Sequence, residues 1–194
     1  MKKIMFNDKY GLTQAVIDGR KTMTRRIATP ATDRRIAFGN VNKEWYEDEE
    51  GKVYIPSYEI GEVIAISQNY KNAGYDGSYT FGASFPIKSL LGWSNKMFVK
   101  AEYMPYKIEI TNVGMSLLQN ISDDDCIKEG VYRLDSANGS GGIAYSFANA
   151  SDKKHIGLYD TPREAFAALI NKVSGGGTWE RNSFVWVYEF KLFD

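Results

Sequence analysis

The sequence has little cysteine and histidine, and both shortages exclude classes of site. Its 194 residues include one cysteine, Cys126, and one histidine, His155. A single cysteine can form no internal disulfide and no zinc ribbon, and a single histidine excludes sites that need two imidazoles. We therefore predict no metal and no cofactor. The acidic neighbours of Cys126 also argue against a reactive thiolate.

Long apolar runs are missing too. No run approaches the roughly 18–20 apolar residues that span a bilayer. Residues 1–8 carry two lysines but lack the apolar segment of a signal peptide. We expect a cytoplasmic protein with no membrane contact and infer no obligate protein partner.

The chain has no net charge, because 24 Lys and Arg residues balance 24 Asp and Glu residues. This balance excludes a protein that coats nucleic acid through bulk electrostatics. The charge is unevenly placed, however. Residues 1–35 carry nine basic and three acidic side chains, a local charge of about +6. Any anionic ligand must therefore be bound locally.

Three segments have the spacing and end signals of helices. Apolar residues recur at helical intervals over 11–19, and Gly19 supplies the stop. Ser122 is expected to cap a short helix that ends at Gly130. Thr161 is expected to cap the clearest helix, with Pro162 in its first turn.

Four segments are predicted to be strands: 62–67, 96–102, 106–113 and 183–193. The last has apolar residues on both faces and is therefore expected in the centre of a sheet. Residues 40–58 are expected to form a hairpin or an exposed loop.

The fold class predicted from this order is α+β, mainly β: one barrel-like domain over 1–194 with two or three short flanking helices. Two insertions, near 70–95 and 133–158, are expected to be long loops. The first is rich in glycine and aromatic residues. It is expected either to pack its own rings on the surface or to cover a substrate.

The basic segment 20–26 is the first candidate for a ligand site. Guanidinium and ammonium groups match phosphate oxygens, and threonine hydroxyls add donors. The alternative is a solvated charged run. The residues concerned are Arg20, Lys21, Thr22, Thr24, Arg25 and Arg26.

Three further residues are weaker candidates. Glu129, near a predicted helix end, could hold a lysine, orient water or shuttle a proton. Trp179 could stack on a base and Asn182 could read a polar edge, although Trp more often packs in a core.

The segment Ala15 to Arg26, with Gly19-Arg20-Lys21-Thr22-Met23-Thr24-Arg25-Arg26 at its end, closely resembles the opening of ASCH domains of the PUA-like superfamily. Later segments resemble the phage and prophage-type bacterial members in the same order: 58–65, 96–113, 121–130 and 161–190. The resemblance implies a PUA-like β-barrel with a cleft beside the first helix, and RNA or a modified nucleotide as the partner.

One small bacterial branch of that family hydrolyses acetylcytidine with a lysine, a threonine and a glutamate. Lys21 and Thr24 match the first two, and Glu129 is the best match for the third. The resemblance then implies Thr24 as nucleophile, Lys21 as base or charge stabiliser, and Glu129 as a group that positions water or protonates the leaving amine. This chain is nearly twice as long as that branch and carries an extra arginine, Arg26, after the motif.

Three hypotheses follow. The first is an RNA- or nucleotide-binding module without catalysis, with Lys21, Arg25 and Arg26 on phosphate. The second is an amidohydrolase for an acylated pyrimidine nucleoside, through Lys21, Thr24 and Glu129. The third is a non-catalytic phage accessory protein.

Overall fold

The main sheet of the protein has five strands. A computed structural model describes residues 1–31, 45–135, 142–147 and 157–193. The strand order is β1 (Lys3–Ile4), β5 (Val63–Ile66), β6 (Lys107–Leu117), β9 (Phe184–Phe193) and β2 (Met23–Ile27). Strand β1 is parallel to β5 and the other pairs are antiparallel. Within the described residues β1 and β2 are the two edges, so the mixed α+β class holds but the predicted barrel is not closed.

The two long strands, β6 and β9, form the centre of the sheet. They pair along most of their length, from Lys107 opposite Phe193 to Leu117 opposite Phe184, with one irregularity between Ile110 and Asn112. This confirms the central position predicted for residues 183–193. Apolar residues on both faces of β9 explain that place, because the strand is covered on both faces and pairs on both edges.

The predicted helices are present with their predicted ends. Helix α1 is Leu12–Ile17, and Gly19 follows it with a φ of 71°. Helix α3 is Asp123–Lys128, and the Ser122 hydroxyl accepts a bond from the Asp125 amide at 3.1 Å. Helix α4 is Pro162–Ser174, capped by Thr161. With 13 residues, α4 is longer than the short helices expected, and a four-residue helix, α5 (Thr178–Arg181), follows it.

Two hairpins extend from the main sheet. Strands β3 (Tyr46–Glu47) and β4 (Val53–Tyr54) form the hairpin predicted within 40–58. The prediction of a long loop over 133–158 was partly wrong, because β7 (Tyr132–Asp135) and β8 (Ile143–Ser146) pair there. The fully buried residues Ser146 and Phe147 anchor this hairpin, which the small-residue composition around it concealed. The rest of that insertion, residues 136–141 and 148–156, lies outside the described residues, as does His155.

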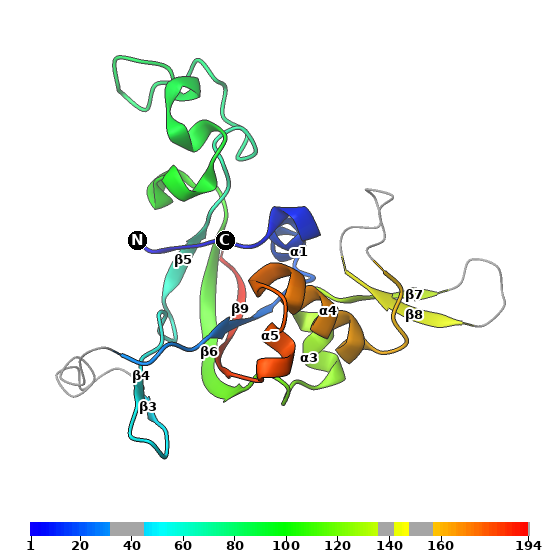
Figure 1. Cartoon of the computed structure of the whole chain (residues 1–194). Helices are drawn as coiled ribbons and strands as arrows, with labels where there is room; N and C mark the ends of the chain where they lie inside the picture. Colours follow the sequence, from blue (N-terminus) through cyan, green and yellow to red (C-terminus); the bar gives the residue numbers. More distant parts are fainter. Residues whose placement is uncertain (32–44, 136–141, 148–156, 194) are drawn as a thin grey trace.

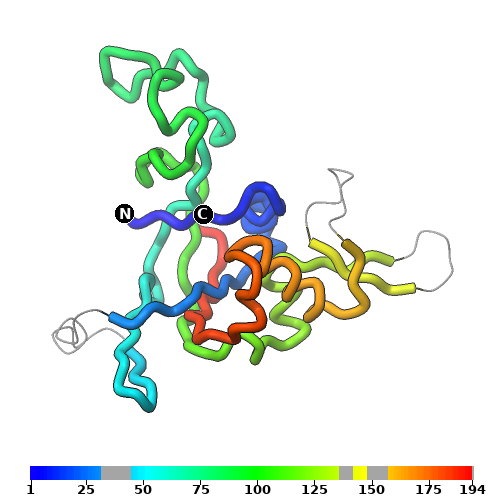
Figure 2. Tube along the Cα trace, viewed as in Figure 1, coloured from blue at the N-terminus to red at the C-terminus, as the bar shows by residue number. Residues whose placement is uncertain are grey.

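Residues 67–106 form a lobe that projects beyond the sheet, at the top of Figures 1 and 2. It contains four 3-10 helices: η2 (Ile87–Ser89), η3 (Leu91–Trp93), η4 (Lys96–Phe98) and η5 (Ala101–Tyr103). The lobe has its own apolar cluster, and its rings pack together: Phe81 stacks on Tyr103 with centroids 3.8 Å apart. The insertion near 70–95 therefore packs its own aromatic residues, as one of the two predictions had it, and is not a structureless loop.

The strand predicted over 96–102 is wrong, since η4 and η5 occupy it. Side chains rather than a neighbouring strand bind the backbone there. The Lys3 ammonium donates to the carbonyls of Met97 and Val99, each at 2.7 Å. The short apolar run Met97-Phe98-Val99 therefore does not indicate a strand here.

The main core lies between the sheet and the helices α1, α3 and α4. Helices α3, α4 and α5 gather on one side of β2 and β9 in Figure 1, and α3 contacts both α4 and β2. This arrangement brings the ends of α1 and α3 next to the start of β2. In the part of the chain that the structure describes, no helix combines the length and apolar character needed to cross a bilayer.

Candidate functional site

Lys21 lies in the turn between α1 and β2. The amides of Arg20 and Lys21 both donate to the carbonyl of Ala15, at 2.9 and 2.8 Å, which folds the chain back after Gly19. Strand β2 then begins at Met23. Because Lys21 precedes the strand, the alternation of side chains along β2 does not force it to the opposite side from Thr24.

The ammonium of Lys21 is buried and has three acceptors. Its Nζ donates to the carbonyl of Met23 at 2.7 Å, to the carbonyl of Glu129 at 2.7 Å and to the Glu129 carboxylate Oε2 at 2.6 Å. An ammonium group has three N–H donors, so all three are used. Both side chains are almost excluded from solvent, with 2% and 5% exposed. Lys21 and Glu129 are 108 residues apart in sequence, and the fold brings them into direct contact.

Burial lowers the pKa of Lys21 below the ordinary value of 10.5. The Glu129 carboxylate opposes this shift by attraction and hydrogen bonding, whereas the nearby charges of Arg26 and Arg25 add to it. The desolvation of the ammonium is the largest effect, as expected for a fully enclosed lysine. Lys21 therefore loses its proton at a lower pH than a surface lysine does.

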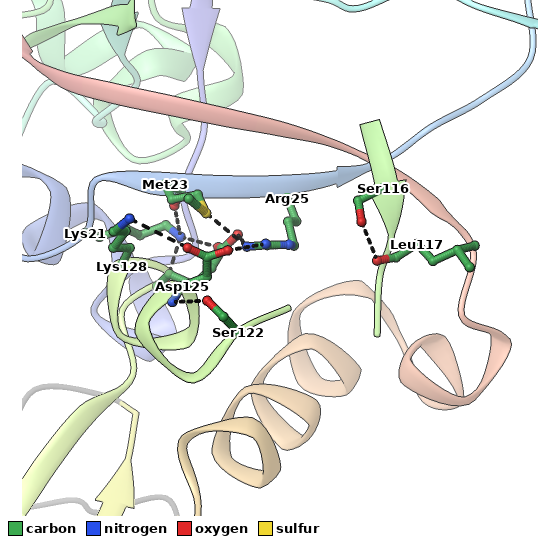
Figure 3. Close-up of polar contacts among 9 residues, drawn as sticks. Lys21, Met23, Arg25, Ser116, Leu117, Ser122, Asp125 and Lys128 are labelled. Carbon is green, nitrogen blue, oxygen red and sulfur yellow. Dashed lines mark hydrogen bonds and ion pairs between the residues drawn. The ribbon is translucent and has the colours of Figure 1, made fainter. Parts of the chain in front are cut away.

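Arg25 joins the same network from β2. One terminal nitrogen, Nη1, lies 3.3 Å from Glu129 Oε1, and the other, Nη2, lies 2.9 Å from Asp125 Oδ2 (Figure 3). Nη1 also donates to the sulfur of Met23 at 3.0 Å. Two cations, Lys21 and Arg25, thus face two carboxylates, Glu129 and Asp125. These four side chains are neutral overall, whereas the pocket beside them is lined by three basic residues, Lys21, Arg25 and Arg26, and one acidic residue, Glu129.

A pocket opens beside the network. Its volume is about 100 Å³, and Lys21, Thr24 and Glu129 all line it. The three residues that the family resemblance implied as catalytic therefore share one cavity. The polar side of the pocket faces an apolar side contributed by α4, through Phe166, Leu169, Ile170 and Val173.

Thr24 is held by the sheet and turned toward the pocket. Its backbone pairs with that of Tyr188 on β9, and 5% of the residue is exposed. The Thr24 hydroxyl makes no hydrogen bond with any other described residue, so it is available to a group that enters the pocket.

The other members of the basic segment are divided between different surroundings. Arg20 is exposed and pairs with Asp18 at 3.0 Å. The backbone of Thr22 bonds to Lys128 and Phe190, and its side chain does not line the pocket. Arg26 is half-buried at the pocket, donates to the Met5 carbonyl at 2.6 Å and lies over the Phe6 ring at 5.6 Å.

The structure does not bring Trp179 and Asn182 to the pocket. Trp179 packs edge-on against Phe166, with centroids 6.1 Å apart, and its ring lies 5.2 Å from the Arg163 guanidinium. Asn182 adopts a positive φ of 47° after α5, and its side-chain oxygen accepts from the Gln119 amide at 2.8 Å. Both residues serve the turn between α4 and β9.

Sequence reasoning missed several residues of the pocket. Met5, Phe6 and Asn7 line it from the segment after β1, and Leu12 lines it from α1. The α4 residues were expected only as a buried stripe. No pattern in the sequence separates apolar residues that pack in a core from those that line a cavity. Asp125 was expected only to favour the helix end, and its pairing with Arg25 depends on the tertiary fold.

Cys126 is fully buried on α3, and its pKa is raised to about 12, chiefly by burial and next by the Asp123 charge. It therefore offers no thiolate, as its neighbours predicted. Among the residues that the structure describes, no three His, Cys, Asp or Glu side chains are placed to hold a metal ion.

Comparisons with known proteins find one structural similarity. No family model matches the chain, and no curated protein matches it. One similar solved structure is an ASCH domain from Lactobacillus crispatus JV V101, which shares 12% identity over 93% of this chain and 69% of that one, with a TM-score of 0.33. A score at this level supports no conclusion about fold or function. The family resemblance therefore rests on the residues of the 15–26 segment.

Proposed function

We propose that the chain is an amidohydrolase that removes the acyl group from the exocyclic amine of a modified pyrimidine nucleoside, such as acetylcytidine. The observation that carries this proposal is the convergence of Lys21, Thr24 and Glu129 on one pocket. The nucleoside class comes from the resemblance of residues 15–26 to ASCH domains. The reaction class comes from the same resemblance, and the shared pocket supports it by bringing the three residues together.

The buried pair supplies both an acid and a base. Lys21 Nζ and Glu129 Oε2 are 2.6 Å apart, so a proton can pass between them and leave a neutral amine beside a carboxylic acid. Burial lowers the pKa of Lys21 and so favours its neutral amine. The amine of Lys21 is then the base, and the carboxylic acid of Glu129 is the proton donor.

The reaction proceeds through an ester of Thr24. Its hydroxyl attacks the acyl carbonyl carbon while Lys21 takes the hydroxyl proton, and a tetrahedral intermediate forms. The C–N bond breaks as Glu129 gives its proton to the leaving amine. A water molecule then hydrolyses the acyl ester, restores the Thr24 hydroxyl and releases a carboxylic acid. Overall, one amide and one water become one amine and one acid.

The size of the pocket supports a small reacting group. Pockets that enclose a drug-sized ligand are about 300–1,000 Å³, whereas this one is about 100 Å³. It admits an acyl group and the edge of a base, and the sugar remains outside. The apolar wall from α4 suits the methyl group of an acetyl substituent.

Product analysis of the purified protein with acetylcytidine tests the proposal. We expect release of cytidine and acetate, abolished in Thr24→Val and lowered by about 10²–10⁴-fold in Glu129→Gln. Thr111→Val is the matched control, because Thr111 is exposed on β6 and lies outside the pocket. Full activity in Thr24→Val would refute the nucleophile, and the absence of turnover in the wild-type protein would refute the function.

Binding without turnover is the second candidate function, and Arg26 favours it. No carboxylate of a described residue pairs with this pocket arginine, so its charge is open to a phosphate. Salt-sensitive binding of an oligonucleotide that weakens in Arg26→Ala, together with no product, would support a non-catalytic RNA- or nucleotide-binding module.

A further inference from the structure

Four charged side chains form a chain of contacts, and three of them, Lys21, Glu129 and Arg25, line the pocket. Lys21 contacts Glu129, Glu129 contacts Arg25, and Arg25 contacts Asp125. Met23 and Arg25 are two residues apart on β2, so their side chains lie on the same face, and the Met23 sulfur accepts from Arg25. Figure 3 shows this face turned toward α3.

We propose that Arg25 is a positioning residue that holds the Glu129 carboxylate through Oε1, so that Oε2 stays on the Lys21 ammonium at the pocket. This inference rests on the proposed amidohydrolase function and assigns Arg25 a role other than the phosphate contact that the sequence indicated.

The contacts of Arg25 favour positioning over ligand binding. Its side chain is 3% exposed, and both terminal nitrogens are already used, on Glu129 and Asp125. A phosphate could reach them only if two buried ion pairs broke. The planar guanidinium also has the shape to bridge two carboxylates, which a lysine ammonium cannot do in the same geometry.

The Glu129 carboxylate is fixed at both oxygens. Oε2 accepts from Lys21 at 2.6 Å and Oε1 lies 3.3 Å from Arg25, so rotation of the carboxylate would weaken both contacts. Asp125 anchors the far end of the network. It lies in the first turn of α3, where the Ser122 hydroxyl accepts from its amide. The N-terminal turn of α3 thus orients a carboxylate at the other end of the same helix.

Arg25 also changes the electrostatics at Lys21. The charged groups that act on Lys21 are Glu129 at the end of α3 and Arg26 and Arg25 from β2. The parts of α1 and α4 that line the pocket contribute apolar side chains and Ser174. Arg25 is a like charge near Lys21, and it also takes part of the attraction of Glu129. Without Arg25 we expect Lys21 to hold its proton more strongly.

The experiment compares the pH profile of acetylcytidine hydrolysis in three proteins. We expect the rising limb of the pH profile to lie about one pH unit higher in Arg25→Met than in the wild type. A shift of one pKa unit corresponds to a modest change in the interaction between charges. Arg25→Lys keeps the positive charge but loses the planar guanidinium that bridges the two carboxylates. The rising limb of its pH profile should therefore stay near the wild-type position while its kcat falls. Arg133→Met is the control, because Arg133 is an exposed arginine of the β7–β8 hairpin paired with Asp135.

The outcomes separate this inference from the proposed function. A wild-type protein without turnover refutes the function. An active wild type whose limb stays in place in Arg25→Met, with kcat lowered equally at every pH, refutes positioning and leaves Arg25 a structural residue.

A second measurement needs no catalysis and tests whether the charge of Arg25 affects the protonation of Lys21. Because the pKa of Lys21 is lowered in the folded protein, the free energy of unfolding should rise as the pH increases toward 10.5. We expect this rise to be smaller in Arg25→Met than in the wild type. An unchanged rise would overturn the coupling between Arg25 and Lys21, and Arg25→Gln, which also removes the charge, serves if the methionine variant does not fold.

Discussion

Replacing Lys21 by methionine tests how much the buried network contributes to the fold. Methionine has a similar length and fills the same space, but it removes three hydrogen bonds of 2.6–2.7 Å. The Glu129 carboxylate keeps the contact with Arg25 at 3.3 Å and remains 5% exposed. The substitution therefore leaves a poorly compensated buried charge.

Removing one partner of a buried ion pair costs about 3–5 kcal/mol. We expect the lower end of this range, about 3 kcal/mol, for a physical reason. The pKa of Lys21 is lowered because burial disfavours the ammonium more than Glu129 favours it, so the substitution also relieves a desolvation cost. Because domains are stable by about 5–15 kcal/mol, the variant should remain measurable.

The assay is urea unfolding at pH 7, followed by circular dichroism. Lys191→Met is the control, since Lys191 is 63% exposed on its side chain and pairs with Glu109 on the surface. We expect this control to change stability by no more than about 0.5 kcal/mol. The double variant Lys21→Met with Glu129→Gln should recover part of the loss, because the uncompensated carboxylate is gone. A loss below about 1 kcal/mol in Lys21→Met, without recovery in the double variant, would refute the buried pair.

Two further predictions use the same residues of the site. The lowered pKa of Lys21 means that the unfolded chain, with a pKa near 10.5, binds more protons than the folded chain between the folded-state pKa and about pH 10.5. Stability should therefore rise with pH toward 10.5 in the wild type relative to Lys21→Met, and parallel melting-temperature curves would contradict this. Cys126 is buried with a pKa of about 12, so a thiol reagent at pH 8 should label it only on unfolding, and rapid labelling of the native protein would show that α3 opens.

Local signals in the sequence predicted the ends of several elements. Ser122 and Thr161 cap their helices because a hydroxyl that accepts from an amide three residues later acts within one turn. Residues 184–193 form an interior strand because both faces of the segment are apolar. These interactions depend on near neighbours, or on the apolar character of one segment, and so can be read without the fold.

The prediction over 96–102 failed where a distant side chain decided the local structure. The segment has a short apolar run like that of a strand, but Lys3, about 95 residues earlier, binds its carbonyls. The open sheet has the same origin, because sheet closure depends on which edges meet. Neither property is encoded by the pattern of the segment itself.

The sequence by itself determined the motif at residues 19–26, the helix caps and the absence of a histidine or cysteine metal site. Only the tertiary structure decided what the charges of that motif do. Lys21 and Arg25 are paired with Glu129 and Asp125, more than 90 residues away, so the local charge of about +6 does not describe their surroundings. The physical reason is that a charge acts through its nearest partners in space, and burial strengthens those contacts while it excludes solvent. The fold thereby turns a basic segment into a neutral buried network beside a pocket.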